Sequence, residues 1–313
     1  MKLKDLSKEL NISISTISRV LSNDQNLKVK EETRNVIIET AIKNGYKFKN
    51  NINDVLIVTS YKKQVESDDP YYLTLRNLIE KELVKNHFNF RVVEYSSFIS
   101  FKKYNIFLGS FNDEQLENIR NNKKINILCD SFTNKENIDC VSFDYKHSVY
   151  TVLDTFINKG HTNIGFIGGK DNNSKLDFRE EYFRKYMKDT NLLNDDYIYI
   201  DNFNSKTGYD GVKKIFKKKI NPTALFVAND SIAMGCYKAL KEMKKKIPSE
   251  VSIIGFNNSE FSEFMIPPLS SVQIFINHIV KESVLLLLEH SESKRKYSKK
   301  IILNTKLLLR ESV

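Results

Sequence analysis

Cysteine is scarce in this chain of 313 residues, which contains only Cys129, Cys140 and Cys236. No two of them have the close spacing of a zinc site or of a redox-active pair. A small, odd number of scattered cysteines is typical of a reducing compartment. We therefore expect a cytoplasmic protein that holds no metal through cysteine.

Long hydrophobic runs are also missing. The longest apolar cluster, Val284–Leu288, is far shorter than the roughly 18 residues that a membrane-spanning helix needs. The first residues are polar and are predicted to enter a helix at once, which is unlike a secretory signal peptide. We expect no association with a membrane.

The sequence lacks the motifs of common enzyme classes. Gly168-Gly169-Lys170 does not have the spacing of a phosphate-binding loop, and no serine lies in a nucleophile elbow. The histidines, among them His147 and His161, have no metal-ligand spacing. We therefore predict that the protein is not an enzyme and needs neither a cofactor nor a metal.

Positive charge, by contrast, is plentiful. The formal net charge is +10, and residues 1–50 contribute +4 of it, with ten Lys or Arg against six Asp or Glu. Such a surplus favours contact with the phosphates of a nucleic acid. An AT-biased genome rich in Lys and Asn codons would produce the same surplus, so charge by itself does not identify a partner.

The first 46 residues predict a helix, a tight turn and a second helix. Apolar residues three and four positions apart predict helices over residues 3–10 and 14–21, and Ser13 suits the N-cap of the second. A third helix is predicted over residues 31–44, with Gly45 as the residue that stops it. This is the pattern of a helix-turn-helix, whose second helix can enter a DNA major groove. The inward-facing residues of the third helix are expected to be Val36, Ile37, Ala41 and Ile42.

The second predicted helix carries short hydroxyl side chains and one long cation. Ser15, Thr16 and Ser18 would let its backbone lie deep in a groove, and Arg19 is long enough to reach a guanine edge with two hydrogen bonds. A three-helix bundle without any role in DNA binding would show the same apolar pattern.

From residue 54 onward, apolar strands alternate with helices. This alternation predicts parallel sheets that are covered by helices on both faces, with ligands bound beyond the carboxyl ends of the strands. The predicted strands are residues 55–59, 90–94, 106–109, 125–130, 140–143, 164–167, 197–200, 224–227 and 252–255. The predicted helices are residues 72–87, 145–159, 176–189, 206–218 and 231–244, and two further strands are expected at 300–303 and 305–309.

Motifs along nearly the whole chain resemble those of the LacI/GalR family of bacterial repressors. The most diagnostic is PTALFVANDSIAMG at residues 222–235. The other matching segments are residues 3–6, 12–13, 16–21, 32–34, 45–46, 160–169, 247–256 and 267–272.

The resemblance implies an N-terminal all-α helix-turn-helix head and an α/β, periplasmic-binding-protein-like core of two Rossmann-like lobes. The implied domains are a DNA-binding domain (1–46), a shortened linker (47–54) and an effector-binding core (55–313). Within the core, the N-lobe would comprise about 55–144 and 277–293, and the C-lobe about 145–274 and 300–313.

The resemblance also assigns the DNA contacts. Ile14, Ser15 and Arg19 would read bases of double-stranded operator DNA, and Thr16 and Ser18 would face or approach its phosphates. A two-fold homodimer fits the palindromic operators that such proteins bind.

A sugar site needs carboxylates and amides for paired hydroxyls, a guanidinium for fork-shaped donation and an aromatic face for the ring. The resemblance implies Arg179 as the sugar clamp and Phe203 as the stacking aromatic. The full implied ligand-binding set is Arg179, Phe203, Asn229, Asn257, Asp130, Phe143, Gln273, Asp69 and Tyr71.

Several of these residues have a purely structural alternative. Arg179 could be a surface charge, Phe203 a core residue, and Tyr71 a ring packed on a neighbouring helix. Asn229 could cap the helix that follows it, and Asp230 fits a cap better than a ligand.

Two features depart from the family pattern. Many members have an aspartate where Asn257 stands, and an amide accepts one hydrogen bond and donates one where a carboxylate accepts two. Residues 47–54 contain neither alanine nor leucine, so they lack the usual Asn-x-x-Ala-x-x-Leu hinge helix. We expect this linker to be disordered or to form a single turn.

Within the family, residues 69–73, 164–169 and 177–180 are most similar to the repressors of galactose and evolved β-galactosidase operons, which implies a galactoside as inducer. We therefore predict a sequence-specific transcriptional repressor controlled by a small sugar. A different effector, a corepressor mode, and a sugar-binding protein without regulation are the alternatives.

Overall fold

The computed structural model describes residues 2–21, 27, 29–46, 54–62, 66, 70–86, 88–96, 99–170, 176–217, 221–292, 295 and 297–313. The linker residues 47–53 and the predicted site residue Asp69 lie outside these described residues. The chain divides into two compact units. Unit 1 comprises Met1–Glu66, Pro70–Ser142 and Ile276–Ile301, and unit 2 comprises Ser67–Asp69, Phe143–Phe275 and Ile302–Val313.

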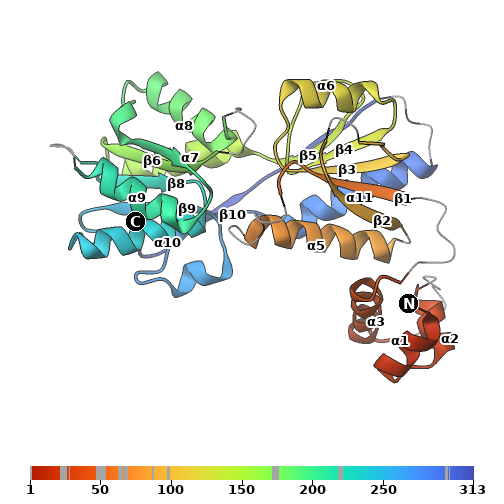
Figure 1. The fold of residues 1–313 in the computed structure, drawn as a ribbon. Helices are drawn as coiled ribbons and strands as arrows, with labels where there is room; N and C mark the ends of the chain where they lie inside the picture. The colour runs from red at the N-terminus through yellow and green to blue at the C-terminus, as the bar shows by residue number, and fades with distance from the viewer. Residues whose placement is uncertain are drawn as a thin grey trace. The chain divides into compact units, whose positions relative to one another are not determined.

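The N-terminal part of unit 1 is a bundle of three helices. They are α1 (Leu3–Leu10), α2 (Ile14–Leu21) and α3 (Glu31–Lys43) (Figure 1). Leu6 and Ile17 are fully buried in it. Ser13 caps α2 as predicted, because its Oγ accepts a hydrogen bond from the backbone N–H of Thr16 at 3.1 Å. The predicted helix, turn and helix are therefore present in the structure.

Helix α3 ends as the sequence predicts and buries Ile37 and Ala41 as predicted, but Val36 lies outside the buried side. Gly45 has a φ of +62°, and Tyr46 N–H donates to the Ala41 carbonyl at 2.9 Å, which closes the helix end. Ile38 is buried, whereas Val36 is 48% exposed. The prediction that Val36 faces inward was wrong, because Ile38 shares the inward side with Ala41 and Val36 falls outside it.

The rest of unit 1 is built on a six-stranded sheet. Its elements are β1 (Asp54–Thr59), α5 (Pro70–Lys85), β2 (Asn89–Glu94), β3 (Tyr104–Leu108), α6 (Asp113–Asn121), β4 (Ile125–Cys129), β5 (Asp139–Phe143), α11 (Ile276–Glu292) and β11 (Lys300–Leu303). The strand order is β11-β5-β4-β3-β1-β2, and β1 to β5 run parallel. Leu116 and Ile119 of α6 pack on one face, and α5 and α11 cover the other (Figure 1). Burial on both faces explains why the inner strands β1, β3 and β4 are mainly apolar, whereas the edge strand β2 is partly exposed and contains Arg91.

Two elements of unit 1 differ from the sequence predictions. Helix α6 was not predicted, because Leu116 and Ile119 are the only two of its residues that are buried. Strand β11 was assigned to the C-lobe, but it pairs with β5 in unit 1: Cys140 N–H donates to the Lys299 carbonyl and Asp144 N–H to the Leu303 carbonyl, both at 2.9 Å. Strand β11 therefore extends the sheet of unit 1, although the boundary between the two units falls within it, after Ile301.

Unit 2 is built on a second six-stranded sheet. Its elements are α7 (Tyr145–Asn158), β6 (Ile164–Gly169), α8 (Phe178–Asp189), the short 3₁₀ helix η1 (Asp195–Tyr197), β7 (Ile198–Asp201), α9 (Ser205–Ile215), β8 (Ala224–Val227), α10 (Asp230–Glu242), β9 (Ser252–Asn257), the short 3₁₀ helix η2 (Glu260–Phe264), β10 (Ser270–Gln273) and β12 (Lys306–Leu308). The strand order is β12-β10-β9-β8-β6-β7, and only β12 is recorded as antiparallel to its neighbour. Helices α7 and α8 lie together on one face, and α9 and α10 on the other (Figure 1).

Both sheets have the same strand order. From one side, strands β2-β1-β3-β4-β5 in unit 1 correspond to β7-β6-β8-β9-β10 in unit 2. In each sheet, the second strand is added on one side of the first, and all later parallel strands are added on the other side. The strand order therefore switches direction between β1 and β3, and between β6 and β8. Ligands of such sheets bind beyond the carboxyl ends of the strands at these switch points. The fold directs attention to the residues that follow β6 and β8.

Helices α9 and α10 are held at very close range by glycine. A Cβ atom on Gly208 would lie 1.9 Å from the Ile232 carbonyl oxygen, and one on Gly235 would lie 1.8 Å from the Ser205 carbonyl oxygen. Backbone therefore meets backbone at this contact, and there is no room for any side chain at either glycine.

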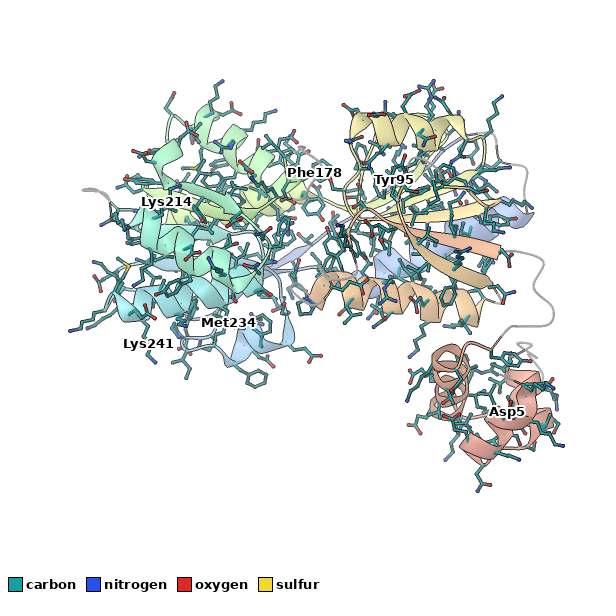
Figure 2. All side chains as sticks on the ribbon, viewed as in Figure 1. Asp5, Tyr95, Phe178, Lys214, Met234 and Lys241 are labelled. Carbon is teal, nitrogen blue, oxygen red and sulfur yellow. The ribbon has the colours of Figure 1, made fainter. Side chains whose placement is uncertain are left out.

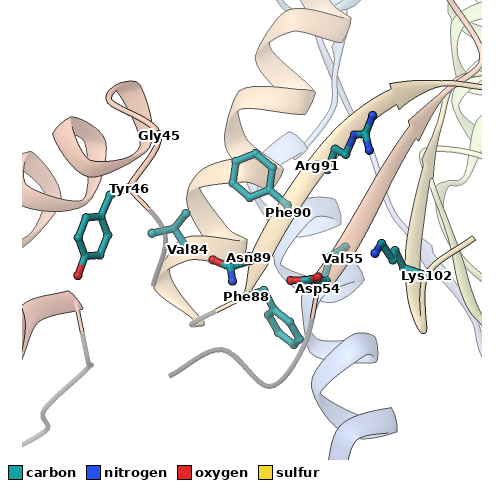
Figure 3. Close-up of a pocket in the computed structure, with 10 residues that line it drawn as sticks. All are labelled: Gly45, Tyr46, Asp54, Val55, Val84, Phe88, Asn89, Phe90, Arg91 and Lys102. Carbon is teal, nitrogen blue, oxygen red and sulfur yellow. The ribbon is translucent and has the colours of Figure 1, made fainter. Parts of the chain in front are cut away.

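The helical bundle packs against the sheet-bearing part of unit 1. Val84 of α5 belongs to the apolar cluster of the bundle, and Lys81 Nζ lies 2.6 Å from a carboxylate oxygen of Glu39. A hollow of about 540 Å³ lies beside this contact, lined by Gly45 and Tyr46 and by residues of α5, β1 and β2 (Figure 3). Unit 1 thus contains a direct contact between the helix-turn-helix bundle and α5. Within the described residues, no helix is long and apolar enough to cross a lipid bilayer.

Candidate functional site

Helix α2 presents its predicted base-reading residues to solvent. Ile14 is 42% exposed, although it is aliphatic, and Ser15 and Arg19 are exposed as well. Thr16 and Ser18 are half-buried. An exposed aliphatic side chain beside a cation and hydroxyls is a suitable surface for the edges and methyl groups of DNA bases. Arg19 nevertheless interacts with other parts of the protein.

In unit 2, Arg179 at the start of α8 is held by a carboxylate. Its Nε donates to Asp177 Oδ1 at 2.7 Å and its Nη2 donates to Asp177 Oδ2 at 2.8 Å, while Nη1 donates to the Ala228 carbonyl at 2.6 Å. Ala228 follows β8, so these bonds join the start of α8 to the switch point between β6 and β8. Arg179 is therefore not a surface charge.

Aromatic rings surround this guanidinium. Its Cζ lies 5.1 Å from the ring centroid of Phe203, 5.3 Å from that of Phe256 and 6.0 Å from that of Tyr145. Tyr145 stacks on Phe256 with centroids 5.8 Å apart, and on Phe178 with centroids 5.5 Å apart (Phe178 is labelled in Figure 2). The Arg179 guanidinium is thus positioned by contacts with aromatic rings as well as by its bonds to Asp177.

Gly169, at the end of β6, has no side chain, and this leaves room for the ring of Phe203. A Cβ atom on Gly169 would lie 2.4 Å from Phe203 Cγ, and the ring therefore lies directly on the backbone of the strand end. Phe203 is only partly buried and packs at the margin of the unit 2 core. A partly exposed ring face at a switch point can stack on the apolar side of a sugar.

Asn229 is a buried helix cap. Its Oδ1 accepts a hydrogen bond from Ile232 N–H at 2.8 Å, and its Nδ2 donates to the Phe203 carbonyl at 3.2 Å. The expectation that Asp230 is the cap was wrong, because Asp230 is the first residue inside α10 and Asn229 has the extended backbone of an N-cap. Through its second bond, Asn229 also fixes the segment that carries Phe203.

Asp230 instead organises the loop after β9. Its carboxylate accepts hydrogen bonds from Ser271 Oγ at 2.7 Å and from the backbone N–H of Ser259. The Asp230 side chain is fully buried, and this burial raises its pKa to about 6 despite the hydrogen bonds that stabilise the charged form. Gly255 makes room for it, since a Cβ there would lie 2.3 Å from Asp230 Oδ1.

The raised pKa of Asp230 makes stability depend on pH. Because the folded state binds this proton more tightly than the unfolded state, whose pKa is near 3.8, stability should fall as pH rises from about 4 to about 6. The difference between the two pKa values corresponds to about 3 kcal/mol. Asp230→Asn should remove this slope, since an amide can keep one bond to Ser259 and one to Ser271.

Urea denaturation of the wild type and Asp230→Asn between pH 4 and pH 7.5 measures this effect. The quantity of interest is the difference between their free energies of unfolding, in which the titration of all other groups cancels. A difference that does not change with pH would contradict the assignment.

Asn257 and Gln273 lie side by side at the carboxyl ends of β9 and β10. They are partners in the register of these parallel strands, and Asn257 has a φ of +96°. The following Asn258 has a φ of +52°, and its Oδ1 accepts a hydrogen bond from Arg310 Nη2 at 2.8 Å. The predicted residue Phe143 is buried, with its ring centroid 6.3 Å from that of Tyr145. Unit 2 therefore collects the predicted residues Arg179, Phe203, Asn229, Asn257 and Gln273 at one edge of its sheet, and Phe143, the last residue of β5, contacts the Tyr145 ring.

In unit 1, two other predicted residues meet. Asp130 follows β4 with a φ of +58°, and its Oδ2 accepts a hydrogen bond from Tyr71 Oη at 2.5 Å. Tyr71 also packs edge-on against Tyr72, with ring centroids 5.5 Å apart. The tyrosine therefore has both a polar partner and an aromatic neighbour. Among the described residues, no group of three or more His, Cys, Asp or Glu could hold a metal ion.

Sequence reasoning did not identify Asp177, Tyr145 or Phe256 as site residues. Asp177 could have been found from its position two residues before Arg179, at the start of a predicted helix, where a carboxylate suits an N-cap. The role of Tyr145 and Phe256 follows only from the three-dimensional packing of α7 and β9 around α8.

Comparisons with known proteins agree with this architecture. A model of the periplasmic binding protein-like domain matches residues 153–313. The chain is 33% identical over 332 residues to the HTH-type transcriptional regulator GanR of Bacillus subtilis (strain 168), and the match covers 99% of both proteins. It is 30% identical over 328 residues to the HTH-type transcriptional regulator GalR of Streptococcus thermophilus, covering 99% of this chain and 98% of that protein.

The fold is also similar to that of a solved structure, the complex of the transcriptional regulator CelR with cellobiose. The TM-score is 0.74 at 18% sequence identity, and the match covers 100% of both chains. At this identity the likeness concerns the fold alone. It extends over the helical bundle and both units.

Proposed function

This chain belongs to the LacI/GalR family of transcriptional regulators, and we propose that it is a repressor that binds a palindromic operator through α2 and releases it when a small neutral sugar binds. The observation that carries the proposal is the presence of two surfaces in one chain. Ile14, Ser15 and Arg19 form an exposed face on α2, and Arg179 lies within a cage of rings at a sheet switch point. The first suits base edges and the second suits a sugar.

The residues around Arg179 match the chemistry of a saccharide. A guanidinium can donate to adjacent hydroxyls, amides such as Asn257 and Gln273 can both donate and accept, and the Phe203 ring can cover the apolar C–H face. A galactoside is the proposed effector class, because residues 177–180 resemble those of galactose-operon repressors. Asp130 and Tyr71 of unit 1, which are joined by a hydrogen bond, are also proposed as sugar-binding residues. The absence of catalytic and metal-ligand patterns in the sequence favours a binding role over an enzymatic one.

Selection of bound duplexes from a genomic library tests DNA recognition. Arg19→Ala should lower the affinity for the selected duplex by about 10- to 100-fold, the loss of one bidentate base contact. Affinity is measured by fluorescence anisotropy at several salt concentrations, because phosphate contacts make it fall steeply with salt. The melting temperature of the variant should stay close to that of the wild type, since Arg19 is exposed.

Arg120→Ala is the matched control, because Arg120 is an exposed arginine on α6 that pairs with Glu117. It should bind the selected duplex like the wild type. Equal affinity of Arg19→Ala and the wild type would contradict the assignment of α2 as the reading helix. Failure of the wild type to enrich any duplex would contradict the proposed function.

An exposed apolar patch in unit 2 supports a homodimer. Ile266 is 91% exposed, Phe264 is 76% exposed and Met234 is 45% exposed. Exposing this much aliphatic and aromatic surface to water is unfavourable. Tyr237 Oη donates to the Pro267 carbonyl at 3.0 Å, so the loop after η2 lies against α10, which carries Met234 (Figure 2). We propose that a second copy of the chain covers this patch, as two-fold symmetry with a palindromic operator requires.

A charge placed in the patch should separate the copies. Ile266→Asp should convert a dimer into a monomer of 36.5 kDa, because burying an unpaired carboxylate is strongly unfavourable. Light scattering coupled to size-exclusion chromatography measures the mass. Lys188→Asp on α8, whose side chain is also exposed, controls for the added negative charge. A wild type that is itself monomeric at micromolar concentration would contradict the proposal.

A further inference from the structure

The carboxylate of Asp177 is not explained by sugar binding as such. We infer that Asp177 both positions Arg179 and compensates its charge, so that the effector site of unit 2 accepts uncharged saccharides and rejects phosphorylated ones. This inference rests on the proposed function, since it specifies the class of sugar that the same site takes.

The Asp177–Arg179 pair has the geometry of a strong, directional interaction. Both carboxylate oxygens engage the guanidinium, at 2.7 Å from Nε and 2.8 Å from Nη2. The side chains are only 13% and 19% exposed, so water competes little for either partner. Bidentate pairs of this kind fix the plane of the guanidinium as well as its position.

Asp177 is itself fixed by the start of α8. Its Oδ1 also accepts a hydrogen bond from the backbone N–H of Arg179 at 2.9 Å, which makes it the N-cap of this helix. One carboxylate therefore holds both the backbone and the side chain of Arg179. The guanidinium cannot move toward a ligand without breaking its two bonds to Asp177 or its bond to the Ala228 carbonyl.

Charges of both signs lie at this edge of the sheet. Lys170 follows β6, Lys306 stands opposite Gln273 in β12, and both side chains are exposed. Asp201 ends β7, and Arg310 Nη2 donates to Asn258 Oδ1 at 2.8 Å. Arg179, with Asp177 as its counter-ion, is the cation that lies among the rings of Phe203 and Phe256.

A phosphate group would gain little from such an edge. Arg179, whose side chain is only 13% exposed, already has a carboxylate as its counter-ion, and a second anion beside it would be repelled by Asp177 at close range. A neutral sugar meets no such repulsion. Its hydroxyls can approach a guanidinium whose orientation is set in advance, and its C–H face can lie on Phe203.

Asp177→Asn separates charge from capping. Asparagine is as good an N-cap as aspartate, so α8 should keep its start. Its amide nitrogen, however, cannot accept a bond from Nη2, so the fork is lost and Arg179 becomes an uncompensated cation. The control is Glu181→Gln, which removes an exposed carboxylate from the first turn of the same helix.

Isothermal titration of the full chain with galactose, lactose and galactose 6-phosphate provides the test. The wild type should bind one of the neutral sugars at least about ten-fold more tightly than the phosphorylated one. In Asp177→Asn, that preference should shrink by about ten-fold or more, through weaker binding of the neutral sugar and tighter binding of the phosphate. Glu181→Gln should keep the preference of the wild type.

The outcomes separate the inference from the function on which it rests. A wild type that prefers galactose 6-phosphate, or an Asp177→Asn variant with an unchanged preference, would overturn the inference and leave a sugar-controlled repressor standing. A wild type that binds no saccharide, neutral or phosphorylated, in a wider panel including cellobiose and ribose would overturn the sugar effector itself. Loss of folding in Asp177→Asn is checked by its melting temperature, and Asp177→Ser then repeats the test with a different capping side chain.

Discussion

Arg179→Ala should weaken effector binding by about 100-fold or more and leave a repressor that stays on its operator when the wild type is released. The truncation removes charge-assisted hydrogen bonds to the ligand, each worth about 1.5–3 kcal/mol. It also leaves Asp177 without its partner inside a cage formed by Tyr145, Phe203 and Phe256. Isothermal titration gives the affinity, and release from the operator is followed by fluorescence anisotropy.

Arg184→Ala is the control for this prediction. Arg184 is on the same helix and is also paired with carboxylates, those of Glu180 and Asp195, but it is more exposed. It should bind the effector and release the operator like the wild type. If Arg179→Ala bound the effector with wild-type affinity, the clamp would have to be assigned to another residue, and Arg179 would be a structural ion pair only.

Gly235→Ala should destabilise unit 2 more than a single methyl group would elsewhere. The new Cβ would lie 1.8 Å from the Ser205 carbonyl oxygen, and α9 and α10 must then move apart along a backbone-to-backbone contact. Overpacking of a rigid interior costs about 3 kcal/mol in unfavourable cases. Since the clash involves backbone rather than a flexible side chain, we expect a loss of at least this size, measured as a lower melting temperature.

Lys241→Ala, at an exposed site on the same helix, should leave the melting temperature within about one degree of the wild type. Gly208→Ala should resemble Gly235→Ala, because its Cβ would lie 1.9 Å from the Ile232 carbonyl oxygen. Normal stability of both glycine variants would mean that α9 and α10 can separate freely, contrary to the close packing in the structure.

The strands were the part of the fold that the sequence predicted best. Residues 224–227 and 300–303 form strands with the predicted bounds, and the bounds of the other predicted strands differ by one or two residues, whereas β10 was not predicted. Strands that are buried on both faces have uninterrupted apolar sequences, so a residue's neighbours along the chain suffice to identify them. The sheet to which a strand belongs is a different matter: β11 joined unit 1 because of its pairing with β5, which no local pattern encodes.

The sequence predicted several residues of the candidate site, but not the residues that position them. Family motifs pointed to Arg179, Phe203 and Asn229, and the structure brings these three to one switch point. Their ligand-binding roles remain predictions. Asp177 and Tyr145 escaped notice because their importance depends on which ring or guanidinium lies next to them in space. Asn229 was named as a possible cap and is one, but Asp230 was also expected to cap, since both residue types favour that position and only the backbone conformation distinguishes them.

The pairing of β11 and β12 has a consequence for the order in which the molecule is made. Strands β5 and β10 are the last parallel strands of their sheets, and each is covered by one short strand from the stretch Lys300–Leu308. Among the described residues, ten strands and every helix precede this stretch, so a ribosome makes them before it makes either cover. Until then, both growing sheets present an unpaired edge, which is a template for pairing with other chains. The same nine residues end this exposure for both sheets at once, so neither edge is protected until Lys300–Leu308 has been made.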